Sequence, residues 1–125
     1  MALAARLSWG VTVAYWLVMA VLTHTPSPRL PHTPISDKTG HVLAYALLGA
    51  GLMVSLWLSR RLRAGTGITV LAVLMGWGAI EEWTQPLVGR SCELADWYAD
   101  VAGAAVAVVT VSLLARLRRY DRGHG

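Results

Sequence analysis

The sequence predicts an all-α integral membrane protein, folded as a four-helix bundle in a single domain over residues 1–125. Two observations lead to this prediction: the composition and the grouping of the apolar residues. Of the 125 residues, 55% are hydrophobic and only 14% are charged, whereas a soluble globular domain carries about 25% charged residues. Four apolar blocks contain no Asp, Glu, Lys, Arg or His, at 7–23, 42–59, 64–80 and 101–115. Few residues remain to cover four such blocks in water, which argues against a soluble domain.

Each block has nearly the length of a membrane-spanning helix, which needs roughly 17–25 residues. Because backbone groups in lipid must be hydrogen-bonded within their own segment, we expect helices. The expected spans are approximately 7–23, 41–59, 65–82 and 96–115. The first block could instead be a signal peptide that starts at Arg6, but no A-x-A cleavage pattern follows it. We therefore expect the first block to remain as a membrane helix.

The basic residues predict the orientation of the four spans. Eight of the eleven lie at the termini or in the loop after the second span: Arg6, Arg60, Arg61, Arg63, Arg116, Arg118, Arg119 and Arg122. Arg29, Lys38 and Arg90 lie on the other side. The positive-inside rule then places both termini in the cytoplasm of a multi-pass protein of the inner (cytoplasmic) membrane. This bias and attraction to anionic lipids account for the net charge of +4, so no nucleic-acid partner is needed.

The acidic residues follow the opposite distribution. Six of the seven fall on or near the predicted outer side: Asp37, Glu81, Glu82, Glu93, Asp96 and Asp100. Acidic residues contribute little to membrane orientation. Their concentration on one side therefore indicates a polar site.

The start of the second predicted helix supplies one wall of this site. At 100° per residue, Asp37, His41 and Tyr45 share a side, with Lys38 at its edge. Asp37 is also expected to act as the N-cap.

The end of the third predicted helix supplies a second wall. Pro86 disfavours helix at Gln85, so the span should end there, and Gly89 permits a turn. Either Glu82 or Glu81 shares a face with Gln85, at spacings of three and four residues.

The fourth predicted helix carries its polar and small residues in one stripe, made of Glu93, Asp96, Asp100, Gly103 and Ala107. Small residues four apart let membrane helices approach closely, so this stripe should face the bundle. A carboxylate one turn inside an apolar block needs a partner, and Arg90, Lys38 and His41 are the candidates for Asp100.

Two other features predict no chemistry. The proline-rich segment 23–36 reads as a stiff connector with His24 and His32 in solvent. Cys92 cannot form an internal disulfide, because it is the single cysteine, and we interpret it as a bystander.

The chain contains three motif segments in order: Asp37-Lys38-x-x-His41-x-x-x-Tyr45, then Glu82-x-x-Gln85, then Arg90-x-x-Glu93-x-x-Asp96-x-x-x-Asp100-x-x-Gly103. This ordered set resembles the motif of the VanZ-like family. The resemblance covers about residues 35–107 and the number of spans. It implies a small four-helix membrane domain, a cell-envelope context and an effect on susceptibility to the glycopeptide teicoplanin, but no defined reaction. The family often has Asn where this chain has Asp100, which adds a carboxylate here.

The first functional hypothesis is binding of an envelope lipid headgroup or a lipidated ligand, such as a lipoglycopeptide, at the outer face. Lys38, His41 and Arg90 would hold a phosphate or carboxylate, since Arg suits bidentate contacts. The ligand-binding residues would be Asp37, Lys38, His41, Tyr45, Glu82, Gln85, Arg90, Glu93, Asp96 and Asp100. No cofactor is expected, and the sequence leaves the oligomeric state open.

The second hypothesis is an enzyme acting on a lipid headgroup, with His41, Glu82 and Asp96 as candidate acid–base residues. A divalent metal held by His41, Glu82, Asp96 and Asp100 is a variant of this hypothesis, although no metal motif fixes its geometry. The third hypothesis is an ion-pair lock that joins three helix ends without a ligand.

Overall fold

The structure is a computed structural model that describes residues 2–26 and 36–124, with side chains up to Tyr120. These residues form four α-helices and no strand: α1 (Leu3–Thr23), α2 (Asp37–Leu58), α3 (Thr66–Thr84) and α4 (Leu94–His124). A 3₁₀ helix, η2 (Gln85–Val88), follows α3. The prediction of an all-α fold is confirmed. Arg29, His32 and most of the proline-rich connector lie outside the described residues.

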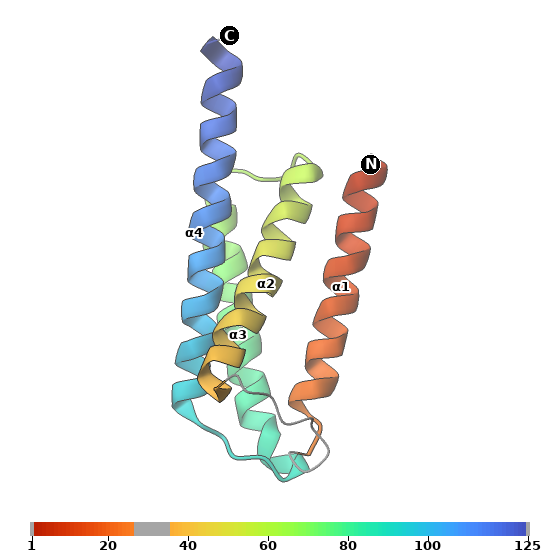
Figure 1. Cartoon of the computed structure of the whole chain (residues 1–125), viewed down its shortest axis with the longest axis vertical. Coiled ribbons are helices and arrows are strands. Elements are labelled where there is room, and N and C mark those ends of the chain that lie inside the picture. The colour runs from red at the N-terminus through yellow and green to blue at the C-terminus, as the bar shows by residue number, and fades with distance from the viewer. Residues whose placement is uncertain (1, 27–35, 125) are drawn as a thin grey trace.

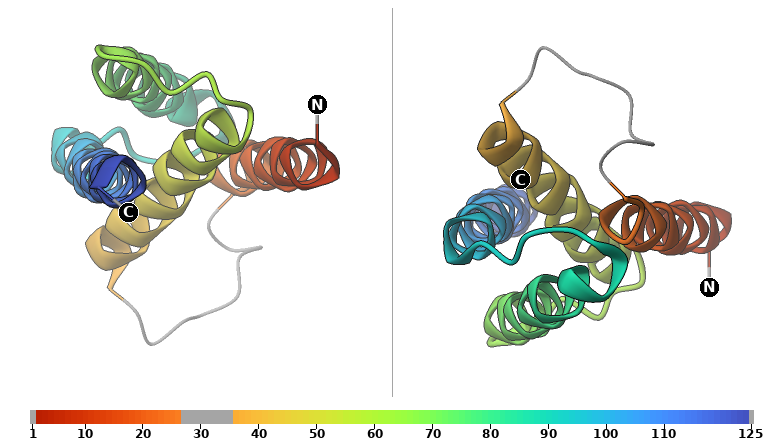
Figure 2. Two further views of the ribbon diagram at one scale, coloured as in Figure 1. Left: turned by 90° about the horizontal axis from the view of Figure 1, so that it is seen from above. Right: turned by 90° about the horizontal axis from the view of Figure 1, so that it is seen from below.

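Helix α2 is the central element of the bundle. It lies between α1 on one side and α3 and α4 on the other, and its most extensive contact is with α4 (Figure 2). Both termini lie at the same end of the bundle (Figure 1). The starts of α2 and α4 and the end of α3 lie at the opposite end, so the chain order brings the three predicted walls together.

The contact between α2 and α4 depends on small residues. A Cβ added at Gly103 would overlap the Val42 carbonyl oxygen and lie 3.0 Å from the Ala46 nitrogen. One at Gly49 would lie 3.2 Å from Ala107 Cβ. The prediction that the small stripe of α4 is a packing face is confirmed.

Helix α1 is attached to α2 by hydroxyl groups within an apolar interface. Ser8 Oγ lies 2.8 Å and Thr12 Oγ1 3.2 Å from Ser55 Oγ, and a Cβ at Gly51 would lie 2.8 Å from Thr12 Oγ1. Polar side chains often hydrogen-bond across membrane helices in this way.

The outer surface of the bundle is apolar over most of its length. Leu7, Leu17, Ile68 and Leu113 are among its exposed large hydrophobic side chains. Among the described residues, α1, α2 and Leu94–Tyr120 of α4 are long and apolar enough to cross a membrane. Helix α3 has 19 residues but carries Glu81 and Glu82 in its last turn, and it falls outside this group.

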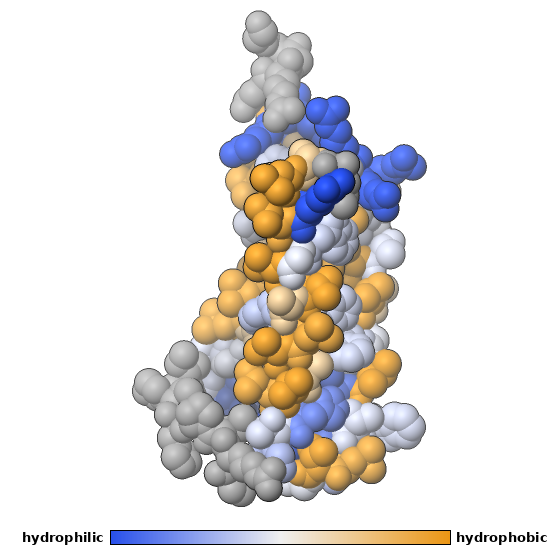
Figure 3. Space-filling view, turned by 90° about the vertical axis from the view of Figure 1, so that its right-hand side faces the viewer, coloured by the Kyte–Doolittle hydropathy of each residue, from blue (hydrophilic) through white to orange (hydrophobic). Residues whose placement is uncertain are grey.

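Strongly hydrophilic side chains cover the end that holds the termini, and the arginines within 60–63 and 116–119 belong to this end (Figure 3). Two of these arginines also make contacts within the protein, so they are more than a solvated cluster. Arg119 donates to the Leu62 carbonyl at 2.7 Å, and the Arg118 guanidinium lies 5.3 Å from the centroid of a Trp57 ring. The first contact attaches the loop between α2 and α3 to α4, and the second joins the last turn of α2 to α4.

Candidate functional site

The first turn of α2 directs a lysine and a histidine toward α4. Ser36, rather than Asp37, is the N-cap, because its hydroxyl accepts from the Thr39 amide at 3.3 Å while Asp37 is the first helical residue. The prediction of an Asp37 cap is therefore wrong. Lys38 Nζ lies 2.5 Å from Asp96 Oδ1 and 3.0 Å from Glu93 Oε2. This pairing joins the starts of α2 and α4.

Three polar side chains at the end of α3 are buried together. Helix α3 ends just before Pro86, and the chain turns at Gly89 with φ 75°. Glu81 and Glu82 are adjacent in sequence, yet both are buried, as is Gln85. Burial therefore does not choose between the predicted pairs Glu81–Gln85 and Glu82–Gln85, because α3 is covered by its neighbours on more than one side at this level.

The start of α4 contributes two buried carboxylates, as predicted. Asp96 is 5% exposed and Asp100 is 2% exposed. His41 Nδ1 lies 2.8 Å from Asp100 Oδ1, and His41 Nε2 lies 3.7 Å from Asp96 Oδ2. When Asp100 is ionised its oxygens only accept, so the donor of this hydrogen bond is then the Nδ1–H of His41. Of the three candidate partners for Asp100, the structure selects His41.

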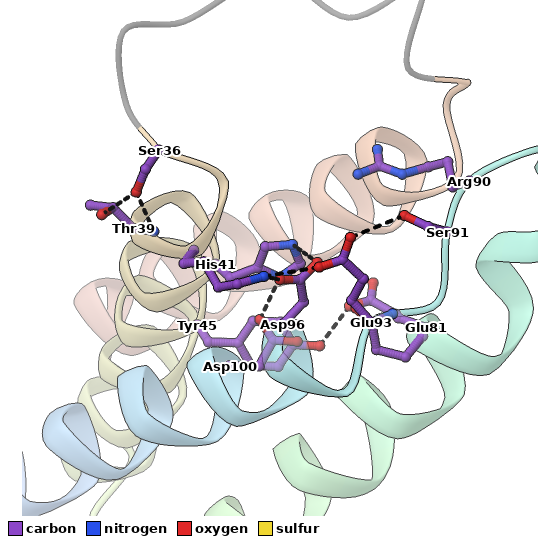
Figure 4. Close-up of polar contacts among 12 residues, drawn as sticks. Ser36, Thr39, His41, Tyr45, Glu81, Arg90, Ser91, Glu93, Asp96 and Asp100 are labelled. Carbon is purple, nitrogen blue, oxygen red and sulfur yellow. Dashed lines mark hydrogen bonds and ion pairs between the residues drawn. The ribbon is translucent and has the colours of Figure 1, made fainter.

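Tyr45 lies one turn below His41 and bonds to the third helix. Its hydroxyl donates to Glu81 Oε2 at 2.5 Å, and Thr23 Oγ1 at the end of α1 donates to Glu81 Oε1 at 3.0 Å. Figure 4 shows His41, Tyr45, Glu81, Asp96 and Asp100 directed toward one another from three helices. Glu81 is thus a hub of the site, whereas the sequence analysis placed Glu82 in the motif.

The end of α1 is a fourth wall that the sequence analysis missed. His24 Nε2 lies 2.8 Å from Thr84 Oγ1, so His24 is bonded to α3 instead of being solvated as expected. Arg90 NH1 donates to the carbonyls of Leu22 and Thr25, at 3.5 and 3.4 Å. The sequence held one signal for this wall: the first apolar block ends in the hydroxyl and imidazole groups of Thr23 and His24, at the same end of the predicted bundle as the other three walls.

The buried cluster has more acceptors than donors. Glu82 Oε2 accepts from the Glu93 amide at 2.9 Å, but Glu82 Oε1 has no hydrogen-bond partner among the described residues. Gln85 Nε2 is a buried donor that also has none. Four carboxylates are buried here, those of Glu81, Glu82, Asp96 and Asp100, and the ion pairs of Lys38 and His41 reach only Asp96 and Asp100 among them. The cluster therefore has a negative excess, and a buried polar atom without a partner destabilises the fold by about 1–3 kcal/mol.

A cavity of about 440 Å³ opens between α1 and α2 beside this cluster. Its apolar lining comes from Met19, Leu22 and Ala44, and its polar lining includes Thr23, His41 and Tyr45. We call this cavity the α1–α2 groove. Its lining also includes Ser36, Asp37 and Gly40 at the start of α2.

The fold and the site together define a helical protein with candidate membrane-spanning helices and a buried, carboxylate-rich cluster at one end of the bundle. Comparisons with protein-family models, with curated proteins and with solved structures find nothing that matches this chain. The resemblance to the VanZ-like family remains a prediction from the motif.

Proposed function

We propose that the chain is a multi-pass membrane protein with four spans and both termini in the cytoplasm, and that it is a member of the VanZ-like family. In support, most of the basic residues belong to the end with the termini, which the positive-inside rule assigns to the cytoplasm of an inner-membrane protein. In this proposal α3 is the third span, with Glu81 and Glu82 at the outer membrane surface. The cluster then lies at the headgroup level of the outer leaflet.

We propose that the α1–α2 groove binds the headgroup of an envelope lipid. The observation that carries this function is the amphipathic lining of the groove: Met19, Leu22 and Ala44 can contact acyl chains, while Thr23, Asp37 and His41 supply polar groups for the headgroup. A site with mostly apolar walls and a few convergent polar groups is typical of small-molecule sites.

The charge of the cluster favours a headgroup that donates hydrogen bonds over a bare phosphate. Of the cations expected to hold a phosphate, Lys38 is paired with two carboxylates and Arg90 bonds the end of α1. A phosphate in the groove would also lie beside the carboxylate of Asp37, which belongs to the groove lining. Amine, amide or hydroxyl hydrogens complement carboxylate oxygens instead. We therefore revise the phosphate of the first hypothesis to an amine- or hydroxyl-bearing headgroup.

A matched pair of lipids and a matched pair of variants test this function. Phosphatidylethanolamine and phosphatidylcholine with the same acyl chains have the same net charge, but only the first has N–H donors. We expect native mass spectrometry of the purified protein to show preferential retention of phosphatidylethanolamine. Gly40→Leu should weaken this retention by about tenfold, or 1.4 kcal/mol, because the leucine fills the groove.

Gly76→Leu is the control, since a Cβ at either glycine meets nothing within 4 Å but Gly76 lies on α3, outside the groove lining. Equal retention of both lipids would contradict a donor headgroup. Unchanged retention in Gly40→Leu would contradict binding in the groove.

A structural lock is the second candidate, because the polar contacts join all four helices. Lys38 and His41 join α2 to α4, Tyr45 joins α2 to α3, and Thr23 joins α1 to α3. The lock predicts that His41→Gln, Glu82→Gln and Asp96→Asn lower membrane abundance and any teicoplanin phenotype in parallel. Lipid binding predicts normal abundance with loss of the phenotype.

A further inference from the structure

Three side chains from three helices converge at the centre of the cluster. One ligand atom each of His41, Glu82 and Asp100 lies within 4.8 Å of the others. Glu82 and Asp100 are buried, and His41 is half-buried. Such a set of one imidazole and two carboxylates from α2, α3 and α4 is the donor set of a metal ligand triad.

An independent observation indicates that a cation belongs at this point. Glu82 is 5% exposed and its Oε1 has no hydrogen-bond partner among the described residues. The other oxygen, Oε2, is already held by the Glu93 amide. A buried carboxylate oxygen without a donor is destabilising, and a metal ion would remove that penalty.

One pair of ligand atoms in the triad is close enough to share a metal ion, and Glu82 offers a third atom within 4.8 Å of both residues. His41 Nδ1 and Asp100 Oδ1 are 2.8 Å apart. Ligands at about 2.0–2.1 Å from an ion are about 2.9 Å apart at right angles and about 3.3–3.4 Å apart in the tetrahedral geometry of zinc. An ion bound by both atoms would replace the proton between His41 and Asp100.

The surroundings of His41 supply the support that a metal-bound histidine needs. Its second nitrogen, Nε2, lies 3.7 Å from Asp96 Oδ2, and Lys38 holds the other oxygen of Asp96. Metal-binding histidines nearly always direct their second nitrogen to a carboxylate, a carbonyl or water. Here Nδ1 would face the ion and Nε2–H would face Asp96.

We propose that His41, Glu82 and Asp100 bind one divalent transition-metal ion, Zn²⁺ or Mn²⁺. The mixed nitrogen and oxygen set excludes a dedicated Ca²⁺ site, which takes oxygen ligands, and a thiolate-selective site. Three protein ligands leave at least one coordination position open, which is the arrangement of catalytic rather than structural zinc sites. The inference goes beyond lipid binding and does not depend on it.

A second triad, Asp37, His41 and Asp96, shares His41 but suits an ion less well. Asp37 is exposed, and Asp96 Oδ1 is already 2.5 Å from Lys38 Nζ. The two triads make opposite predictions for Asp37, which allows an experiment to separate them.

The test uses the full chain, purified in detergent and stripped of metal with EDTA. One sample is titrated with Co²⁺, whose absorption bands report nitrogen and oxygen coordination. A second sample is titrated with Mn²⁺, and its binding is followed by electron paramagnetic resonance. We expect saturable binding of one ion per chain, together with a rise in the thermal unfolding midpoint. If the unmodified protein shows neither saturable binding nor a rise in the unfolding midpoint, the proposal is overturned. This result does not depend on whether any variant folds.

Isosteric variants then locate the ion. Glu82→Gln and Asp100→Asn should abolish saturable binding, and Asp96→Asn should weaken it by about 10–100-fold through loss of the His41 support. Asp37→Asn should leave metal binding unchanged. Loss of metal binding in Asp37→Asn would assign the ion to the second triad and overturn the proposed site of His41, Glu82 and Asp100. Gly40→Leu should retain the ion even where it loses the lipid, so the two proposals can fail separately.

Discussion

Tyr45 illustrates how one side chain can have two roles in the bundle. Its ring belongs to the buried core, with 1% of its surface exposed, and its hydroxyl donates to Glu81 at 2.5 Å. Tyrosines of membrane proteins are common at the interface, where the ring is buried and the hydroxyl is in water. Here the hydroxyl is bonded inside the bundle, so Tyr45 is a donor of the site.

We predict that Tyr45→Phe lowers the free energy of unfolding by about 1–3 kcal/mol, because Glu81 keeps a buried carboxylate with one donor fewer. Thermal unfolding in detergent measures the change, with Tyr98→Phe as the control, since Tyr98 is 59% exposed. In the Tyr45→Phe and Glu81→Gln double-mutant cycle, the two changes should couple. Equal effects of Tyr45→Phe and Tyr98→Phe would contradict a stabilising bond.

At the scale of the elements, the contact between α2 and α4 sets the width of the site. Gly103 allows the two backbones to approach at the level of Val42 and Ala46, one turn beyond the His41–Asp100 pair. A wider separation would draw His41 away from Asp100. The small residues of α4 therefore position the polar residues that precede them.

We predict that Gly103→Ala is destabilising by about 1–3 kcal/mol, because the added methyl meets backbone atoms of α2 that cannot rotate away. Thermal unfolding measures the loss, and the cobalt titration should show weaker binding as the helices separate.

Gly76→Ala is the matched control, since a Cβ there meets nothing within 4 Å. In a helix interior, this change is neutral or favourable by up to about 1 kcal/mol. A Gly103→Ala protein as stable as Gly76→Ala would show that the helices do not need this close approach.

At the scale of the whole molecule, charge and polarity are segregated between the two ends of an apolar bundle. Basic side chains gather beside the termini, and the carboxylate cluster lies at the far end. The orientation in the membrane is a proposal from this segregation, and Cys92 offers a direct test because it is exposed and is the single cysteine.

We predict that a membrane-impermeant maleimide labels Cys92 in intact cells. In a Cys92→Ser background, Arg61→Cys should be labelled only after permeabilisation, since residue 61 lies at the basic end. Labelling of both positions in intact cells would show that α3 does not span the membrane. The reversed pattern would place the cluster in the cytoplasm.

The sequence by itself determined the helical class, the approximate bounds of the helices and the inward direction of Asp96 and Asp100. Blocks of apolar residues, prolines and four-residue spacing are local signals, and local signals suffice for these features. The cluster of His41, Tyr45, Gln85, Asp96 and Asp100 could likewise be expected, because four alternating spans bring the starts of the second and fourth helices and the end of the third to one end of the bundle.

Only the tertiary structure decided which side chains pair. The sequence left Arg90, Lys38 and His41 as partners of Asp100, and packing selects His41 because Arg90 reaches the end of α1 and Lys38 reaches Asp96. The roles of Thr23 and His24 also depend on where α1 ends relative to α3, 58 and 60 residues further along the chain. Helical periodicity fixes directions within one helix, whereas contacts between helices depend on their separation and relative height, which no local pattern encodes.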